Sequence, residues 1–368
     1  MSKIKVLVID DSAIVRQVLS TIINETAGME VIDTAQDPLF ALKKLEAIKP
    51  DVIILDVEMP RMDGLTFLKK LMNENPHPVV MCSTLTQKSS DTSMKALRLG
   101  AVEIVSKPTS NLKQELGEQK KLITDAIKAA SKAKLSNLRM PAKMPAPKLN
   151  VQKKETADVI LPKLATVQSA PSNKLIAIGA STGGTQALEH VISALKPDTP
   201  GVVIVQHMPE AFTAAFSKRL DGISEVYVKE AEDGDMVETG KVLIAPGGKH
   251  MIVENRAGKL YVSIKEGPLV SRHRPSVDVL FRSVAQSAAR QTLGIIMTGM
   301  GDDGANGMKE MFDNGAFTLA QDEKSCVIFG MPAVAIERGG VKQIVPLGKI
   351  PPMINAFNRP VEFKNLLN

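Results

Sequence analysis

Short apolar runs of strand length alternate with stretches of helical character over residues 1–128. The apolar runs lie at residues 4–10, 30–35, 52–56, 79–82 and 103–106. A last helix is expected over residues 113–134. This alternation is typical of a parallel sheet with helices on both faces. We therefore expect a five-stranded, doubly wound α/β domain at residues 1–128.

The apolar pattern resumes at Lys174. The segment LIAIGASTGGTQALEHVI, residues 175–192, indicates a buried strand, a glycine-rich turn and a helix. The stretch 225–267 has GD, GG and AG turn signals and little helical period, which favours antiparallel pairing at one edge. We expect a larger, mainly parallel, doubly wound α/β domain with an added antiparallel hairpin at residues 172–368.

The segment between these domains, residues 129–171, is rich in Pro, Ala and Lys, which is typical of an extended linker. Residues 132–154 carry seven Lys or Arg and no acid, so they account for the net charge of +6. Aromatic residues are only 3%, Trp is absent and no short helix-turn-helix pattern follows. The basic charge therefore does not predict a nucleic-acid partner.

No apolar run approaches the roughly 18 residues that span a bilayer, and the start MSKIKVLVIDD has acids where a signal peptide needs an apolar core. The two cysteines, Cys82 and Cys326, fall in different domains, which suits a reducing compartment. We expect a cytoplasmic protein.

Polar residues follow the apolar runs of the first domain: Asp10, Asp11, Asp56, Thr84 and Lys107. The carboxyl ends of parallel strands face one crevice, so these residues should converge. Three neighbouring carboxylates repel one another, and Mg²⁺ is the usual cation that offsets this repulsion. Beside it, Asp56 can accept a phosphoryl group that the Thr84 hydroxyl and the Lys107 ammonium contact. The alternative is that the first two acids cap a helix and that Lys107 is a surface lysine; the joint spacing favours the pocket.

This ordered set resembles the receiver domain of two-component response regulators. The resemblance implies Asp56 as phosphoacceptor, Thr84 and Lys107 as phosphate-sensing residues, and a histidine kinase as phosphodonor. It also implies metal ligands, which are Asp10, Asp11, Asp56 and the backbone carbonyl of Glu58. Two positions depart from the family pattern: Glu58 stands where many receivers carry Asn, and Ile104 where many carry an aromatic residue.

Ser181 lies at the strand-to-helix corner of the second domain, in the G-x-S-x-G spacing of a nucleophile elbow. Small residues there allow a sharp turn, and the helix amides that follow point toward an oxyanion formed at the hydroxyl. A glycine-rich turn of this kind can equally cradle a phosphate or a nucleotide. The pattern alone leaves both interpretations open.

A hydroxyl nucleophile needs a base, and the buried run GVVIVQ is followed directly by His207. A further run, TLGIIM, leads to an acidic loop with Asp302 and Asp303, which are candidates for helix caps, metal ligands or the carboxylate that orients the imidazole. The other histidines, His273 among them, are weaker candidates. The chain order Ser, His, Asp argues against the α/β-hydrolase fold, in which the acid precedes the histidine.

The motifs GASTGG, VQHMP, RPSVDVLF, MTGMGDDGANG and SCVIFGMP together resemble the catalytic domain of chemotaxis protein-glutamate methylesterases. The resemblance implies Ser181 as nucleophile, His207 as general base and then acid, and Asp303 as orienting carboxylate. It places Thr182 and Met300 beside the nucleophile, where their backbone amides can serve the oxyanion. Asp302, in place of the more usual Asn, is a departure that adds charge near the site.

The resemblance further implies a reaction. The protein is expected to remove methyl groups from glutamate esters on the cytoplasmic helices of methyl-accepting chemoreceptors, with release of methanol, and to deamidate particular receptor glutamines. No cofactor is expected for the esterase reaction. A chemotaxis histidine kinase is the expected phosphodonor, and the protein is expected to reach the membrane only through its receptors.

Overall fold

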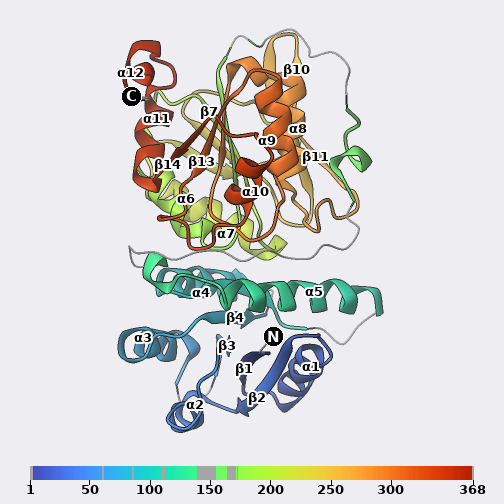
Figure 1. The fold of residues 1–368 in the computed structure, drawn as a ribbon, viewed down its shortest axis with the longest axis vertical. Helices are drawn as coiled ribbons and strands as arrows, with labels where there is room; N and C mark the ends of the chain where they lie inside the picture. The colour runs from blue at the N-terminus through green and yellow to red at the C-terminus, as the bar shows by residue number, and fades with distance from the viewer. Residues whose placement is uncertain are drawn as a thin grey trace. The chain divides into compact units, whose positions relative to one another are not determined.

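The computed structural model describes residues 3–59, 62–84, 87–108, 113–138, 155–163, 171 and 173–366 (Figure 1). The chain divides into two compact units, Met1–Arg139 and Met140–Asn368. Within the described residues, no helix is long and apolar enough to cross a membrane.

The first unit is a five-stranded parallel sheet with strand order β2-β1-β3-β4-β5. Its strands are β1 (Ile4–Ile9), β2 (Met29–Ala35), β3 (Val52–Asp56), β4 (Val79–Ser83) and β5 (Glu103–Ser106). Its helices are α1 (Ala13–Asn24), α2 (Pro38–Leu45), α3 (Gly64–Glu74), α4 (Gln87–Arg98) and α5 (Lys113–Ala130), followed by the short η1 (Leu135–Leu138). The predicted doubly wound domain and all five of its strands are confirmed.

The local sequence explains why these elements begin where they do. Every residue of β3 is buried, as expected for a central parallel strand with helices on both faces. The Asp37 side chain accepts hydrogen bonds from two backbone amides at the start of α2, and the Asp63 side chain accepts one from Thr66 at the start of α3. Each cap satisfies amides that a helix otherwise leaves unpaired.

The second unit contains a seven-stranded sheet with order β14-β13-β12-β6-β7-β9-β8, in which every pairing is parallel. Its strands are β6 (Leu175–Ala180), β7 (Gly201–Gln206), β8 (Tyr227–Glu230), β9 (Lys241–Ile244), β12 (Thr292–Ile296), β13 (Phe317–Gln321) and β14 (Gln343–Val345). Its helices are α6 (Gly184–Ile192), α7 (Glu210–Asp221), α8 (Val277–Ser287), α9 (Ala305–Asp313), α10 (Met331–Glu337), α11 (Ile350–Ala356) and α12 (Pro360–Leu366). The short 3₁₀ turns are η2 (Ala157–Val159), η3 (Ala289–Gln291) and η4 (Leu347–Lys349).

The order of these strands reverses at β6. From β6 the chain moves to β7 on one side, and it later returns through β12 on the other side. In open α/β sheets, ligands bind at such a switch point, beyond the carboxyl ends of the strands. The crevice between the ends of β6 and β12 is therefore where the fold favours a site.

The antiparallel part of this unit is smaller than the sequence suggested. Among the strands of the described residues, only β10 (His250–Arg256) and β11 (Lys259–Lys265) pair antiparallel, and they form their own two-stranded sheet. The expectation that the whole stretch 225–267 forms hairpins is wrong for β8 and β9, which pair parallel with each other and extend the main sheet. Turn residues mark where a strand ends but do not fix the direction in which the next strand pairs.

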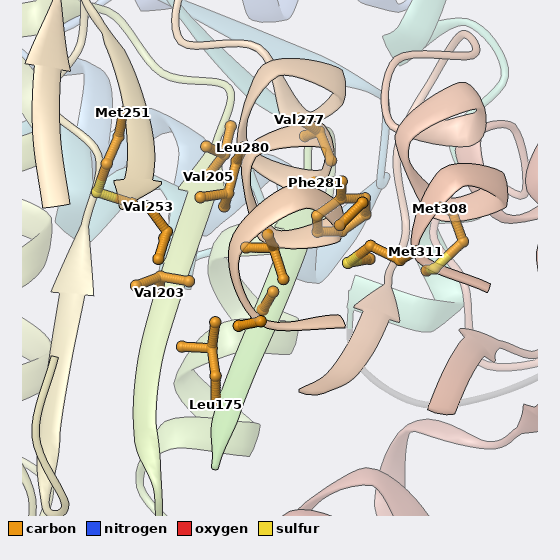
Figure 2. Packing of buried hydrophobic residues seen from close by; sticks show 14 of the residues in the cluster. Leu175, Val203, Val205, Met251, Val253, Val277, Leu280, Phe281, Met308 and Met311 are labelled. Carbon is orange, nitrogen blue, oxygen red and sulfur yellow. The ribbon is translucent and has the colours of Figure 1, made fainter. Parts of the chain in front are cut away.

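One buried apolar cluster joins the main sheet, the hairpin and the helices α8, α9 and α10. Figure 2 shows side chains of β7, β10, α8 and α9 meeting in this cluster. They include Val203, Val205, Met251, Val253, Leu280, Phe281, Met308 and Met311. Burying each such side chain contributes about 1.5–3 kcal/mol, so α8 is fixed firmly beside the sheet.

A described piece of the expected linker, residues 155–163, packs on the second unit. The buried guanidinium of Arg282 in α8 pairs with Asp158 at 2.8 Å and with Glu310 at 2.7 Å. Ala157 and Ile160 join a small apolar cluster with residues of β10 and α8. The remainder of the expected linker that precedes this piece, from residue 139, lies outside the described residues.

Candidate functional sites

The predicted acidic pocket of the first unit forms at the carboxyl ends of β1 and β3. Asp10 and Asp11 follow β1, and Asp56 ends β3, the neighbouring strand. One ligand oxygen from each of the three residues lies within 4.8 Å of those of the other two. Three carboxylates at this spacing are a donor set that suits a hard divalent cation with oxygen ligands.

Lys107 brings its ammonium group into the same pocket. Its Nζ lies 2.8 Å from Asp56 Oδ2 and 3.0 Å from Asp10 Oδ2. Burial raises the pKa of the Asp56 carboxyl to about 6; the Lys107 hydrogen bond opposes this shift, and the charge of Asp10 adds to it. One ammonium therefore does not compensate the acidic charge, which is the condition that favours a bound cation.

The other predicted residues of this pocket lie at the same edge of the sheet. Thr84 is exposed and directly follows β4, the strand next to β3. The backbone amide of Glu58 lies 3.4 Å from Asp56 Oδ1, and the side chain of Glu58 is exposed. Sequence reasoning missed Arg16 of α1, whose guanidinium donates to the backbone carbonyls of Asp10 at 2.8 Å and Asp11 at 3.1 Å.

In the second unit, the predicted serine, histidine and aspartate lie in the segments that follow three adjacent strands. Ser181 follows β6, His207 follows β7 on one side of it, and Asp303 lies in the loop after β12 on the other side. The backbone amide of His207 donates to Ala180 at 3.1 Å, and that of Ser181 donates to Thr298 at 3.0 Å. Main-chain hydrogen bonds thus join the ends of all three strands.

His207 and Asp303 are in direct contact. Nε2 of the imidazole lies 2.8 Å from Oδ2 of the carboxylate, and their side chains are only 7% and 0% exposed. The other ring nitrogen, Nδ1, is buried and has no hydrogen-bond partner among the described residues. When Nε2 carries the hydrogen and donates a hydrogen bond to the carboxylate, Nδ1 presents a lone pair that can accept a proton.

Asp303 is held at the start of α8. Its Oδ1 accepts hydrogen bonds from the Ser276 hydroxyl at 2.8 Å and the Asp278 amide at 3.0 Å, and its Oδ2 accepts one from the Val277 amide at 2.8 Å. The amides at a helix N-terminus interact favourably with negative charge, so the start of α8 suits a carboxylate at this position. Sequence reasoning noted the motif RPSVDVLF but missed this role, although a serine before an apolar helical run is a typical N-cap signal.

The turn at Ser181 is built from close backbone approaches. Gly183, the N-cap residue of α6, has a φ of +77°, which lies in the left-handed region that favours glycine. At Gly299, a Cβ would lie 2.7 Å from the Cβ of Ser181, so the loop after β12 passes directly against the serine. The next residue in that loop is Met300, and Thr182 is buried beside Ser181 with its carbonyl accepting from the Thr298 hydroxyl.

The sequence makes His273 a weaker candidate than His207, yet its ring lies against that of His207. The two ring centroids are 3.6 Å apart and the planes are inclined by 8°. The loop that carries His273 has positive φ angles at Ser271 and Arg272, which are uncommon for residues with side chains. No spacing rule relates positions 207 and 273, so the sequence carried no signal for this contact.

The two acids of the GDDG loop have different neighbours. Asp303 contacts His207, whereas Asp302 is half-buried and pairs with Arg338 at 3.3 Å. A guanidinium thus compensates the extra charge that Asp302 brings to this loop. A further buried acid, Asp278, has its pKa raised to about 7 because burial disfavours its charge and Asp303 repels it.

A receiver-like unit followed by a larger α/β unit with a polar site at its switch point defines a response regulator with an enzymatic output domain. Residues 6–116 match the response regulator receiver domain family, and residues 176–354 match the CheB methylesterase family.

Relatives match nearly the whole chain. A protein-glutamate methylesterase/protein-glutamine glutaminase of Geobacter metallireducens is 54% identical over 95% of this chain and 98% of its own length. One of Pseudomonas syringae pv. tomato is 55% identical over 95% and 97%. The crystal structure of the Thermotoga maritima CheB methylesterase catalytic domain is 39% identical and covers 50% of this chain and 98% of its own, with a TM-score of 0.49. The chain belongs to the protein-glutamate methylesterase/protein-glutamine glutaminase family.

Proposed function

We propose that this protein is a phosphorylation-regulated serine hydrolase of bacterial chemotaxis. Its substrates are glutamate methyl esters on the cytoplasmic helices of chemoreceptors, which it hydrolyses to glutamate and methanol, and specific receptor glutamines, which it hydrolyses to glutamate and ammonia. The observation that carries the proposal is the His207–Asp303 hydrogen bond beside the Ser181 turn, because it leaves His207 Nδ1 available as a base.

In the first half of the proposed reaction, Ser181 Oγ attacks the carbonyl carbon of the substrate. The hydroxyl proton passes to His207 Nδ1, and the imidazolium that forms is stabilised by the Asp303 carboxylate on Nε2. The tetrahedral intermediate then expels methoxide or the amide nitrogen, which takes the proton from His207. The products of this half are an acyl ester on Ser181 and free methanol or ammonia.

In the second half, water replaces the leaving group. His207 accepts a proton from the water as the water oxygen attacks the acyl carbon. His207 then returns this proton to Ser181 Oγ as the bond between Oγ and the acyl carbon breaks. In both halves of the reaction, the backbone amides of Thr182 and Met300 donate hydrogen bonds to the oxyanion. Two facts support this role: Thr182 follows the nucleophile at the start of a helix, and Gly299 brings the Met300 segment against it.

The receiver domain is the proposed control element. Asp56 accepts the phosphoryl group from a chemotaxis histidine kinase, and Thr84 and Lys107 contact the group once it is bound. Asp10, Asp11, Asp56 and the backbone carbonyl of Glu58 would hold Mg²⁺, which would supply positive charge facing the incoming phosphoryl oxygens. The two domains are proposed at residues 1–128 and 172–368, with the linker at 129–171, in a cytoplasmic protein.

The test is release of methanol from methylated receptor membranes and of ammonia from receptors with glutamine at the same sites. The full chain should release both, and Ser181→Ala should release neither. Ser193→Ala is a matched control, since Ser193 is an exposed serine at the other end of α6. Normal release by Ser181→Ala would refute the proposed chemistry.

A further inference from the structure

Gln206 joins the main chains of the proposed nucleophile and base. It is the last residue of β7 and only 2% exposed. Its Nε2 donates to the backbone carbonyl of Ser181 at 3.0 Å and to that of His207 at 3.0 Å. One side-chain amide therefore uses both of its N–H groups on the two residues whose side chains must meet for proton transfer.

The orientation of this amide follows from its partners. If the amide were reversed, its oxygen would face two carbonyl oxygens, and neither contact would contain a hydrogen. The oxygen Oε1 is instead buried with no hydrogen-bond partner among the described residues. A buried acceptor without a partner lowers the stability of the fold. The amide thus makes two hydrogen bonds through its nitrogen and leaves its oxygen unsatisfied.

Gly184 provides the space in which the amide lies. A Cβ at this position would be 2.1 Å from Gln206 Oε1 and 2.9 Å from the Cβ of Ala180. A side chain at 184 is therefore incompatible with the observed place of the amide. This gives a physical reason for the last glycine of GASTGG, in addition to the turn that Gly183 makes.

We propose that Gln206 is a positioning residue that fixes the separation of Ser181 and His207. The inference rests on the proposed hydrolase function and adds a residue to it. The last backbone hydrogen bond between β6 and β7 runs from the His207 amide to the Ala180 carbonyl. Beyond it, the segment after each strand leads into its own helix. The Gln206 amide extends the connection beyond the ladder, to the carbonyls of the two residues that react.

The role predicts an effect on turnover rather than on substrate binding. Gln206 is buried beneath the turn, so its loss leaves the substrate-facing surface in place and alters the distance from Ser181 Oγ to His207 Nδ1. A misplacement of about 1 Å costs up to about a hundredfold in rate. We expect kcat to fall between about tenfold and a hundredfold, with KM within about threefold of wild type.

The test measures kcat and KM for methanol release by full-length Gln206→Met and Gln206→Glu. Both keep the approximate volume of the side chain, and both lose the N–H donors. Gln206→Glu should be the slower of the two, because its carboxylate oxygens would face two carbonyl oxygens. If Gln206 acts only through packing, both variants should retain wild-type kcat, and that result would overturn the inference.

A second variant reaches the same amide from the other side. Gly184→Ala should displace Gln206 and lower kcat by a similar factor, and the double variant Gly184→Ala, Gln206→Met should be no slower than the slower single one. Losses that multiply would show that Gly184 does not act through Gln206 and would contradict the positioning role of this amide.

The control for lost stability is Thr292→Val. Thr292 is the first residue of β12, at the end of the strand away from the proposed site, and is 1% exposed. Its hydroxyl donates a buried hydrogen bond to the Ala288 carbonyl at 2.9 Å. Its variant should lower resistance to urea while kcat stays at the wild-type value. If Ser181→Ala is inactive and the Gln206 variants are normal, this inference alone fails; if Ser181→Ala is active, the proposed function fails.

Discussion

The imidazole of His273 stacks on that of His207 with 3.6 Å between ring centroids. In the proposed reaction His207 becomes a cation, and a cation is attracted to the face of an aromatic ring within about 6 Å, by about 0.5–2 kcal/mol for Trp, Tyr or Phe. The face of His273 is therefore placed to stabilise the imidazolium and to restrict its rotation.

We expect His273→Ala to lower kcat by about 2- to 30-fold, and His273→Phe to retain most of the activity because it keeps an aromatic face. The measurement is the kcat of methanol release by each variant at a pH where the wild type is most active. His190→Ala is the control, since His190 is exposed within α6. A phenylalanine variant as slow as the alanine variant would show that stacking is not the role of His273.

The different neighbours of Asp302 and Asp303 predict an order of activities. Asp303→Asn removes the charge that stabilises the imidazolium, and we expect a loss of at least several hundredfold, though less than for Ser181→Ala. Asp302→Asn breaks a partly exposed pair with Arg338, and we expect an effect of less than about threefold. Turnover of the two variants, compared under the same conditions, decides the assignment; the reverse order would move the orienting role to Asp302.

Phosphorylation of the receiver should depend on Asp56 and on a divalent cation. With Mg²⁺ and a small phosphodonor, the full chain should incorporate phosphate that is labile to alkali, as an acyl phosphate is. Chelation of the metal, or Asp56→Asn, should prevent incorporation. Asp51→Asn is the control, because Asp51 precedes β3 at the other end of the sheet and accepts a hydrogen bond from the Lys5 amide. Phosphate on the Asp56→Asn protein would place the acceptor elsewhere.

The buried Asp278 predicts how the stability of the second unit depends on pH. Its pKa in the folded protein, about 7, lies above the ordinary value of 3.8 because of burial and the charge of Asp303. The folded protein therefore holds a proton that the unfolded chain releases, and this contribution to the unfolding free energy is present below about pH 4 and lost as the pH rises to about 7.

Replacing this acid should flatten that dependence. We expect the unfolding free energy of Asp278→Asn to fall less than that of the wild type between pH 5 and pH 8. The only two tyrosines, Tyr227 and Tyr261, lie in the second unit, so tyrosine fluorescence during urea unfolding reports on this unit. Equal pH dependence in both proteins would mean that Asp278 is not the group that titrates.

The sequence predicted the sites whose polar residues directly follow strands of a parallel sheet. Asp10, Asp56 and Lys107 each follow an apolar run, and a parallel sheet brings such positions together, so the acidic pocket could be predicted before any coordinates. The same logic placed Ser181 and His207 at one edge of the second sheet. Strand direction was less accessible, because the pairing of β8 and β9 depends on long-range contacts and not on the turns beside them.

The contacts that the sequence did not predict join segments far apart in the chain. Ser276 and His273 approach Asp303 and His207 only because the apolar face of α8 packs between the sheet and the hairpin. Gln206 was visible as a polar residue ending a buried strand, but its two bonds depend on the turn across from it. The docking of Asp158 on Arg282 also went unpredicted, since a polar segment rich in Lys and Pro carries no pattern that marks one ion pair.

The most direct test of the account is the rate of methanol release by Ser181→Ala, His207→Ala and the double variant, measured on one preparation of methylated receptor membranes. Residues that act as one catalytic unit give losses that do not add. Each single variant should be slower than the wild type by several orders of magnitude, and the double variant should be about as slow as either one. A double variant slower by the product of the two single losses would contradict a shared nucleophile and base.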